Sequence, residues 1–235
     1  MKITNTKDTA NSRVKICIYG QSGIGKTSLA STLKDKTIVL SLEGGTLSLQ
    51  DHDIDMIDCT VDDKGTLLKE ADRLTKMYEA FTFLSNEEVR KKYKVVFVDS
   101  LTEIGDCLFK VLDAKYAGAK NKFEVWGEFA KSMESIIRML RDTPHYDVIM
   151  TALEKEVSDD SGNLLYVRPE LPGQKAHSKL MASLDEYFRY SFVDKKRMIQ
   201  CDASPGIRAK DRSGKLNLIE EPNLDLILKK IRGGK

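Results

Sequence analysis

The sequence predicts an α/β protein built on a mostly parallel, doubly wound sheet that ends in an antiparallel hairpin. Apolar runs such as Val95–Val98 are nearly continuous, as in parallel strands that helices cover on both faces. Segments with helical apolar spacing lie between these runs, and this alternation is typical of doubly wound sheets. Near the end of the chain, two extended segments flank Asp194–Lys196, which predicts the hairpin.

The expected strands have the length and apolar content of strands bounded by polar or turn residues. The first strand leads into a glycine-rich loop, and the last two form the predicted hairpin. In chain order the strands are Val14–Tyr19, Lys36–Leu42, Asp55–Cys59, Lys94–Asp99, Asp147–Leu153, Glu186–Val193 and Arg197–Cys201.

Helices are expected where apolar residues repeat at helical spacing and fall on one face. The first helix, Thr27–Leu33, follows the glycine-rich loop, and a later one ends before Pro144. Trp126, the one tryptophan, is interpreted as a core residue, with base stacking as the alternative. The other apolar faces are Leu67, Ala71, Leu74 and Tyr78; Leu101, Ile104, Leu108 and Leu112; Trp126, Phe129, Met133, Ile136, Ile137 and Leu140; and Leu224, Ile227, Leu228 and Ile231.

The composition is that of a globular protein, because 41% of the 235 residues are hydrophobic and this allows a large core. We expect a flexible polar segment at residues 1–12 and one domain over residues 13–235. The net charge of +2 provides no overall field that would attract nucleic acid or membranes. No apolar run reaches about 18 residues, so we expect no membrane span and a cytoplasmic location. Neither a zinc site nor a disulfide framework is indicated by the scattered cysteines Cys17, Cys59, Cys107 and Cys201.

A phosphate-binding loop is predicted between the first strand and the first helix. The segment fits the pattern G-x-x-x-x-G-K-[ST], whose glycines let successive backbone N–H groups point at an anion. In such loops the Lys reaches the β- and γ-phosphates, the hydroxyl ligates Mg²⁺, and the following helix adds partial positive charge. A glycine turn without a ligand is the alternative. The expected nucleotide-binding residues are Gly20, Gln21, Ser22, Gly23, Ile24, Gly25, Lys26, Thr27 and Ser28.

Hydrolysis of a bound nucleotide also needs a metal ligand and a group that activates water. Asp99 ends an apolar strand at the sheet edge where the loop also lies, so we expect it to hold Mg²⁺ with Thr27; a helix cap is the alternative. The expected activator is Glu43, which follows the second strand, unless it is only a solvated turn residue. Glu103 is the other candidate, but its place four residues after Asp99 directs it along a helix, away from the strand edge.

Two further sets of polar residues are candidates for the site. Thr151 or Glu154, at the end of the strand that starts at Asp147, is expected to sense the γ-phosphate, with a loop carboxylate as the alternative for Glu154. Lys210 and Arg212 present two cations from one short extended segment. At an active site they would neutralise charge in the transition state, and on spacing alone a solvated basic loop is the alternative.

Together these segments resemble the RecA-like P-loop ATPases, in particular the phage Sak-type branch related to RecA, RadA and DnaB. Gly20–Thr27 is similar to their Walker A loop, Leu40–Gly45 to the segment whose Glu activates water, and Val95–Ser100 to their Walker B strand. Lys210–Gly214 is similar to the Lys-Asn-Arg-x-Gly motif of RadA and DnaB, whose Lys and Arg reach the ATP of a neighbouring subunit. The sensor strand departs from the family, since Leu153-Glu154 stands where the relatives have Gln or His.

The resemblance implies a RecA-like core, ATP and Mg²⁺ as cofactors, and a homo-oligomeric ring or filament in which Lys210 and Arg212 act in trans. It also implies two loops that bind single-stranded DNA, here Lys115–Phe123 and Lys155–Lys179, the second with a predicted hairpin tip at Ser161–Asn163. Lysines and aromatics suit backbone contact and base stacking, and a solvated surface is the alternative for both loops. The expected DNA contacts are Lys115, Lys120, Lys122, Arg168, Lys175 and Lys179.

Three functions are compatible with these residues. The favoured one is a Mg²⁺-dependent ATPase of phage-type recombination in the host cytoplasm, which binds single-stranded DNA and promotes annealing or strand pairing, with a single-strand binding protein as a further partner. The second is an ATPase that remodels a protein partner without DNA. The third is a GTPase or small-molecule kinase, which is disfavoured because no D-x-x-G follows Asp99 and no N-K-x-D follows an apolar strand.

Overall fold

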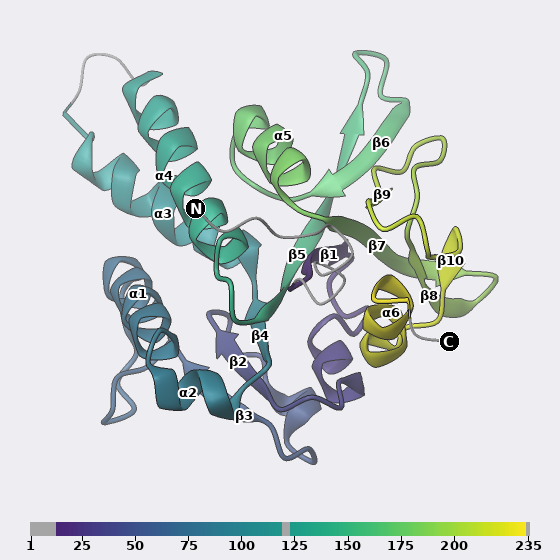
Figure 1. The fold of residues 1–235 in the computed structure, drawn as a ribbon. Helices are drawn as coiled ribbons and strands as arrows, with labels where there is room; N and C mark the ends of the chain where they lie inside the picture. The colour runs from purple at the N-terminus through teal and green to yellow at the C-terminus, as the bar shows by residue number, and fades with distance from the viewer. Residues whose placement is uncertain (1–12, 119–122, 234–235) are drawn as a thin grey trace, which may run out of the picture.

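The computed structural model describes residues 13–118 and 123–233, and the strands in these ranges form a single ten-stranded sheet (Figure 1). In chain order the elements are β1 (Lys15–Gly20), the 3₁₀ helix η2 (Thr27–Thr32), β2 (Thr37–Ser41), the 3₁₀ helix η3 (Leu47–Leu49), β3 (Asp55–Asp58), α1 (Glu70–Leu84), α2 (Glu87–Lys92), β4 (Val95–Asp99), α3 (Leu101–Lys115), α4 (Phe123–Arg141), β5 (Asp147–Ser158), β6 (Leu164–Pro169), α5 (Gln174–Ser183), β7 (Glu186–Val193), β8 (Lys196–Gln200), β9 (Lys210–Asp211), β10 (Ile219–Glu220) and α6 (Leu224–Ile231).

The centre of the sheet is parallel, and the strand order is β10-β8-β7-β1-β5-β4-β2-β3. β1 lies between β5 and β7 and is parallel to both. β8 pairs antiparallel with β7 and β10, which gives the C-terminal hairpin. The predicted fold class is therefore confirmed. Because β1, β2, β4 and β5 all run the same way, the residues that follow them meet at one edge of the sheet.

Two apolar cores cover the two faces of the sheet. Successive side chains of a strand point to opposite faces, so Cys17 and Tyr19 of β1 pack with α1, α3, α4 and α5, whereas Ile16 and Ile18 pack with η2 and α6. Every residue of β1, β2 and β4 is buried. Burial on both faces is the reason these strands are continuous apolar runs in the sequence.

The structure corrects two of the predicted helices. The helix after the glycine-rich loop is the short 3₁₀ helix η2, which ends at Thr32. Leu67 lies before α1 and forms a bridge with Val61, so it is 75% exposed rather than on the buried face, and Tyr78 is 45% exposed. Of the predicted face, Leu74 is buried as expected, and the other buried residues of α1 are Met77, Ala80, Phe81 and Leu84.

The segment predicted as a second loop, Lys155–Lys179, is instead a hairpin followed by a helix. β5 continues to Ser158 and pairs with β6, so the hairpin projects beyond the rest of the sheet (Figure 1). The predicted tip is confirmed, because the Asp159 carboxylate accepts hydrogen bonds from the Ser161 and Asn163 N–H groups. α5 then returns the chain to the start of β7.

No helix within the described residues is both long and apolar enough to span a membrane.

Gly20 is expected to tolerate no side chain, because a Cβ there would lie 2.2 Å from the Tyr190 carbonyl oxygen of β7. Gly20→Ala would force β1 and β7 apart, so we expect it to lower the free energy of unfolding by about 2 kcal/mol or more, measured in urea. Gly127→Ala is the matched control, since a Cβ on that residue of α4 meets no atom within 4 Å. Equal losses in the two variants would contradict this account.

Candidate active site

The predicted phosphate-binding loop joins β1 to η2 at the carboxyl edge of the sheet. Gly23 and Gly25 adopt φ of 76° and 100°, a region that glycine enters without strain and that curls the backbone around an anion. Lys26 lies across the loop, and its Nζ donates hydrogen bonds of 2.9 Å to the Gly20 and Gln21 carbonyl oxygens. Burial lowers the pKa of Lys26, and the nearby carboxylates Glu43, Asp99 and Glu154 oppose this shift.

Asp99 is a buried carboxylate, 3% exposed, that a hydrogen bond joins to the residue after Lys26. The Thr27 hydroxyl donates to Asp99 Oδ2 at 2.6 Å, and the Thr151 hydroxyl of β5 donates to Asp99 Oδ1. Lys26 and Asp99 therefore belong to the same side of the molecule. One carboxylate and one hydroxyl beside a phosphate-binding loop are oxygen ligands that fit Mg²⁺, which takes its other ligands from phosphates and water. No group of three or more His, Cys, Asp or Glu side chains in the described ranges forms a separate metal site.

Glu43 lies at the same edge, in the turn after β2, where the Ser100 hydroxyl donates a hydrogen bond to its Oε1. The Ser100 side-chain oxygen also accepts a hydrogen bond of 3.3 Å from the Glu103 N–H. This fully buried side chain therefore caps the start of α3 and at the same time holds Glu43 in place. Atoms packed around the carboxylate raise the pKa of Glu43, the Ser100 hydrogen bond lowers it, and Asp99 raises it again. These contacts leave Glu43 with access to solvent, as a group that orients water requires.

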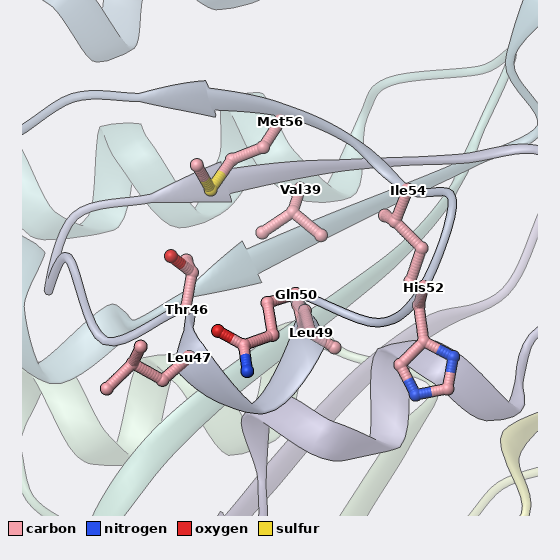
Figure 2. Close-up of a pocket in the computed structure, with 8 residues that line it drawn as sticks. All are labelled: Val39, Thr46, Leu47, Leu49, Gln50, His52, Ile54 and Met56. Carbon is pink, nitrogen blue, oxygen red and sulfur yellow. The ribbon is translucent and has the colours of Figure 1, made fainter.

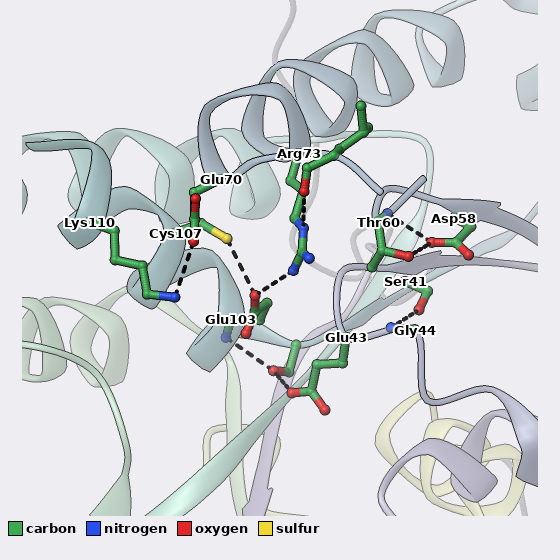
Figure 3. Close-up of polar contacts among 12 residues, drawn as sticks. Ser41, Glu43, Gly44, Asp58, Thr60, Glu70, Arg73, Glu103, Cys107 and Lys110 are labelled. Carbon is green, nitrogen blue, oxygen red and sulfur yellow. Dashed lines mark hydrogen bonds and ion pairs between the residues drawn. The ribbon is translucent and has the colours of Figure 1, made fainter. Parts of the chain in front are cut away.

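Glu103, the other candidate activator, is engaged elsewhere. Its Oε1 accepts a 2.9 Å hydrogen bond from Arg73 of α1 and a weaker one from the Cys107 thiol, as Figure 3 shows. Arg73 is in turn fixed by the Leu68 carbonyl oxygen at 3.1 Å. The geometry favours Glu43, since Glu103 joins α3 to α1 rather than facing the loop.

The two candidate sensors differ in their contacts. Thr151 touches Asp99 directly, whereas Glu154 forms a two-pronged pair with Arg189 of β7, at 3.0 and 3.3 Å. The Glu154 side chain is 5% exposed, so this pair is nearly buried beside the loop. Arg189 was not among the predicted site residues; its position opposite Tyr19, one residue before the loop, depends on the pairing of β1 with β7.

Lys210 and Arg212 lie away from the phosphate-binding loop of their own chain. Lys210 pairs with Tyr187, which is opposite Cys17, so both cations sit toward the start of β1. The Lys210 ammonium donates to the carbonyl oxygens of Met181, at 2.7 Å, and Leu184 at the end of α5. Arg212 is more than half exposed and pairs with Asp185 at 3.0 Å. Their action on a neighbouring subunit stays a prediction.

The structure describes the side chains of two of the six predicted DNA contacts, Arg168 and Lys115. Arg168 is wrong as a surface contact, because it is 8% exposed and donates to the Pro169 carbonyl oxygen; the base of the hairpin folds onto Tyr19, whose hydroxyl lies 3.4 Å from the Val167 oxygen. Lys115 is exposed but pairs with Glu128 at 2.8 Å. Lys120 and Lys122, and the side chains of Lys175 and Lys179, lie outside the described residues.

Trp126 is a half-buried residue rather than a core anchor, since it is 44% exposed. Its ring packs on Phe109 with centroids 4.6 Å apart. That contact ties α4 to α3.

A separate pocket of about 310 Å³ lies beside β2, η3 and β3 (Figure 2). Its lining is mostly apolar and includes the exposed side chains Leu47 and Met56. None of the predicted site residues lines it, so it is distinct from the site at the loop.

The loop, the buried Asp99 and the parallel sheet together define a P-loop nucleotide hydrolase. A family model described as "AAA domain" (AAA_24) matches residues 12–213, so the chain belongs to this family and is a P-loop ATPase. No curated protein matches.

Two solved structures resemble the chain in fold, each at 15% sequence identity. One is a prototypical ATPase from the type III secretion system of pathogenic bacteria, with a TM-score of 0.48 and 79% of this chain covered. The other is the assembled ATPase EscN in complex with its central stalk EscO from enteropathogenic E. coli, with a TM-score of 0.45 and 80% covered. This chain spans about half the length of each, 54% and 46%.

Ser100→Ala is expected to slow hydrolysis about tenfold with ATP binding retained, because Glu43 loses the hydroxyl that holds it. That hydrogen bond lowers the pKa of Glu43, so its loss moves the acid limb of the pH–rate profile to higher pH. Ser100→Thr keeps the hydroxyl and should restore both. Asn86→Ala removes a comparable helix cap from α2, far from the site, and controls for stability. A normal pH profile in Ser100→Ala would count against this positioning.

Proposed function

We propose that this chain is a Mg²⁺-dependent ATPase that works as a homo-oligomer on single-stranded DNA, in a phage-type recombination reaction in the cytoplasm. The observation that carries the ATPase part is the hydrogen bond of 2.6 Å from Thr27 to Asp99, beside Lys26 in the curled loop. A loop for phosphates, a carboxylate for the metal and a second carboxylate for water are the parts that phosphoryl transfer to water needs.

Each of the site residues has a defined role in this proposal. Lys26 and the loop N–H groups bind the β- and γ-phosphates, and Thr27 with Asp99 holds the metal, which supplies charge neutralisation. Glu43 orients the attacking water and accepts its proton. Thr151 holds Asp99 through a hydrogen bond, and this contact links the γ-phosphate end of the site to β5.

Nucleotide competition tests the choice of ATP. We expect ATP to be hydrolysed in preference to GTP, with turnover lost when EDTA removes Mg²⁺. A clear preference for GTP, or transfer of the phosphate to a small molecule instead of water, would support the GTPase or kinase alternative.

The DNA part is favoured by the projecting β5–β6 hairpin. Arg208 is exposed and lies over the Tyr166 ring at 4.4 Å, a cation and an aromatic face that suit a phosphate and a base. Filter binding of single-stranded oligonucleotide should show affinity that falls with salt and weakens in Arg208→Ala. A chain that ignores single strands at low salt, with and without ATP, would exclude this function and, with it, a link to a single-strand binding protein.

The second candidate, an ATPase that remodels a protein partner, is favoured by two apolar side chains on the same hairpin. Leu164 and Leu165 are 55% and 51% exposed. Under this alternative a partner is captured after nuclease treatment, and Leu165→Ser loses it while Arg208→Ala does not. The two variants therefore separate the candidates.

Arg212→Ala is expected to lose most ATP turnover while the isolated subunit still binds ATP, because the proposed finger acts on a neighbour. Mixing Arg212→Ala with Lys26→Ala subunits should restore part of the turnover, since some interfaces then combine an intact loop with an intact Arg212. Sedimentation with an ATP analogue checks assembly in parallel. Absence of rescue at every mixing ratio would contradict a shared site.

A further inference from the structure

Three polar groups of one chain converge beside Gly25 of the phosphate-binding loop. A methyl group built on Gly25 would lie 3.9 Å from each of Arg197 Nη1, Tyr190 Oη and Ser28 Oγ. Ser28 belongs to η2, Tyr190 to β7 and Arg197 to β8, so segments far apart in sequence meet at this spot. The expected nucleotide-binding residues include Ser28 alone of the three.

Arg197 is available for an anion. It is exposed, and within the described part of the chain it forms no ion pair; its guanidinium lies 6.0 Å from the centre of the Phe192 ring. The tight turn at Asp194 and Lys195, both at positive φ, sets the register in which Arg197 faces Phe192 across the hairpin. The hairpin therefore fixes the guanidinium near the loop without neutralising it.

Tyr190 offers a second donor at the same spot. It is 4% exposed, and burial raises the pKa of its hydroxyl while Arg197 lowers it, so it is a neutral phenol at ordinary pH. Buried tyrosine hydroxyls usually find a hydrogen-bond partner. The Tyr190 ring packs in the core with Ile24 and Leu29, which holds the hydroxyl in place.

The strand order decides which part of a nucleotide these groups meet. Asp99 and Glu43, which mark the metal and the attacked phosphate, follow β4 and β2. In the order β8-β7-β1-β5-β4-β2 these strands lie on one side of β1, and Tyr190 and Arg197 lie on the other. Tyr190 and Arg197 therefore lie on the side of the loop away from the bond that is broken. There they meet the α-phosphate and ribose end of the nucleotide.

We propose that Arg197 and Tyr190 bind the α-phosphate end of the nucleotide in cis, so that each subunit carries its own arginine for affinity besides any cation from a neighbour. This inference rests on the proposed ATPase function. A guanidinium presents two parallel N–H groups to phosphate oxygens, and the phenol donates to a third position. Both act on ground-state binding and leave the hydrolytic step to Glu43.

Binding of ATP and ADP at equilibrium tests the proposal, with a fluorescent nucleotide or calorimetry as readout. Arg197→Ala should weaken both nucleotides about tenfold, and Tyr190→Phe should weaken them less, whereas turnover at saturating ATP stays near that of the unchanged chain. Lys196→Ala is the matched control, because it removes the same charge from the adjacent residue of the hairpin, whose side chain points to the opposite face. Arg197→Lys should recover part of the affinity.

The outcomes separate this inference from the function on which it rests. Equal affinity in Arg197→Ala and the unchanged chain, or an equal loss in Lys196→Ala, overturns the cis contact. A fall in turnover at saturation with unchanged affinity assigns Arg197 to the chemical step and overturns it as well. If Lys26→Ala binds ATP normally, the ATPase site itself is misplaced; if Lys26→Ala loses binding and Arg197→Ala does not, only this inference fails.

Discussion

Lys26→Ala is expected to reduce ATP turnover by about 10³-fold or more, since in the proposed site its ammonium is the charged group of the loop that would contact the β- and γ-phosphates. The structure gives the lysine a second task, because its Nζ joins the Gly20 and Gln21 carbonyl oxygens and so tightens the curl of the loop. Loss of both tasks should weaken nucleotide binding as well as hydrolysis. Turnover and equilibrium binding of ATP measure the two effects separately.

Lys34→Ala is the matched control for this prediction. Lys34 is exposed, follows the same 3₁₀ helix and has no ion pair within the described ranges. Its removal changes the net charge equally, so turnover should stay within about twofold of the unchanged chain, as surface substitutions usually do. The thermal unfolding midpoints of both variants show whether a loss of turnover comes from the loop or from a loss of stability. Comparable activity in the two variants would mean that phosphates bind elsewhere.

The sequence predicted the sheet well because its physical signal is local. Strands buried on both faces must be apolar throughout, so β1 and β4 stand out without knowledge of their partners. The same logic placed Asp99, since parallel strands deliver whatever follows them to one edge. Glycines that need positive φ, Gly23 and Gly25, are equally visible in a pattern.

Contacts between distant segments were not predictable in the same way. The sequence shows the charge of a basic residue in a polar stretch but not whether that residue is buried. Arg168 is buried because the base of the hairpin folds onto Tyr19. Arg189 joins Glu154 only because β7 pairs with β1. The sequence pattern shows Ser100 only as part of the strand motif, because its hydrogen bond to Glu43 depends on β2 lying beside β4.

Glu43→Gln is expected to abolish hydrolysis while ATP binding is kept or strengthened. The amide preserves the size of the side chain and can still accept the Ser100 hydrogen bond, but it does not take a proton from water. General-base catalysis contributes roughly 10²- to 10⁴-fold, which sets the expected loss. Single-turnover hydrolysis and nucleotide affinity measure the two properties. Glu103→Gln is the control, since Glu103 pairs with Arg73, and it should hydrolyse ATP near the normal rate.

The pH dependence of turnover gives this assignment an independent check. The packing around Glu43 raises its pKa above the usual 4.5, and only the ionised carboxylate accepts a proton from water. Activity should therefore be complete above the raised pKa and fall as the pH drops through it, at a higher pH than a glutamate without atoms packed around its carboxylate would give. The residual activity of Glu43→Gln should lack this limb. If the limb persists in Glu43→Gln and disappears in Glu103→Gln, the water activator is Glu103.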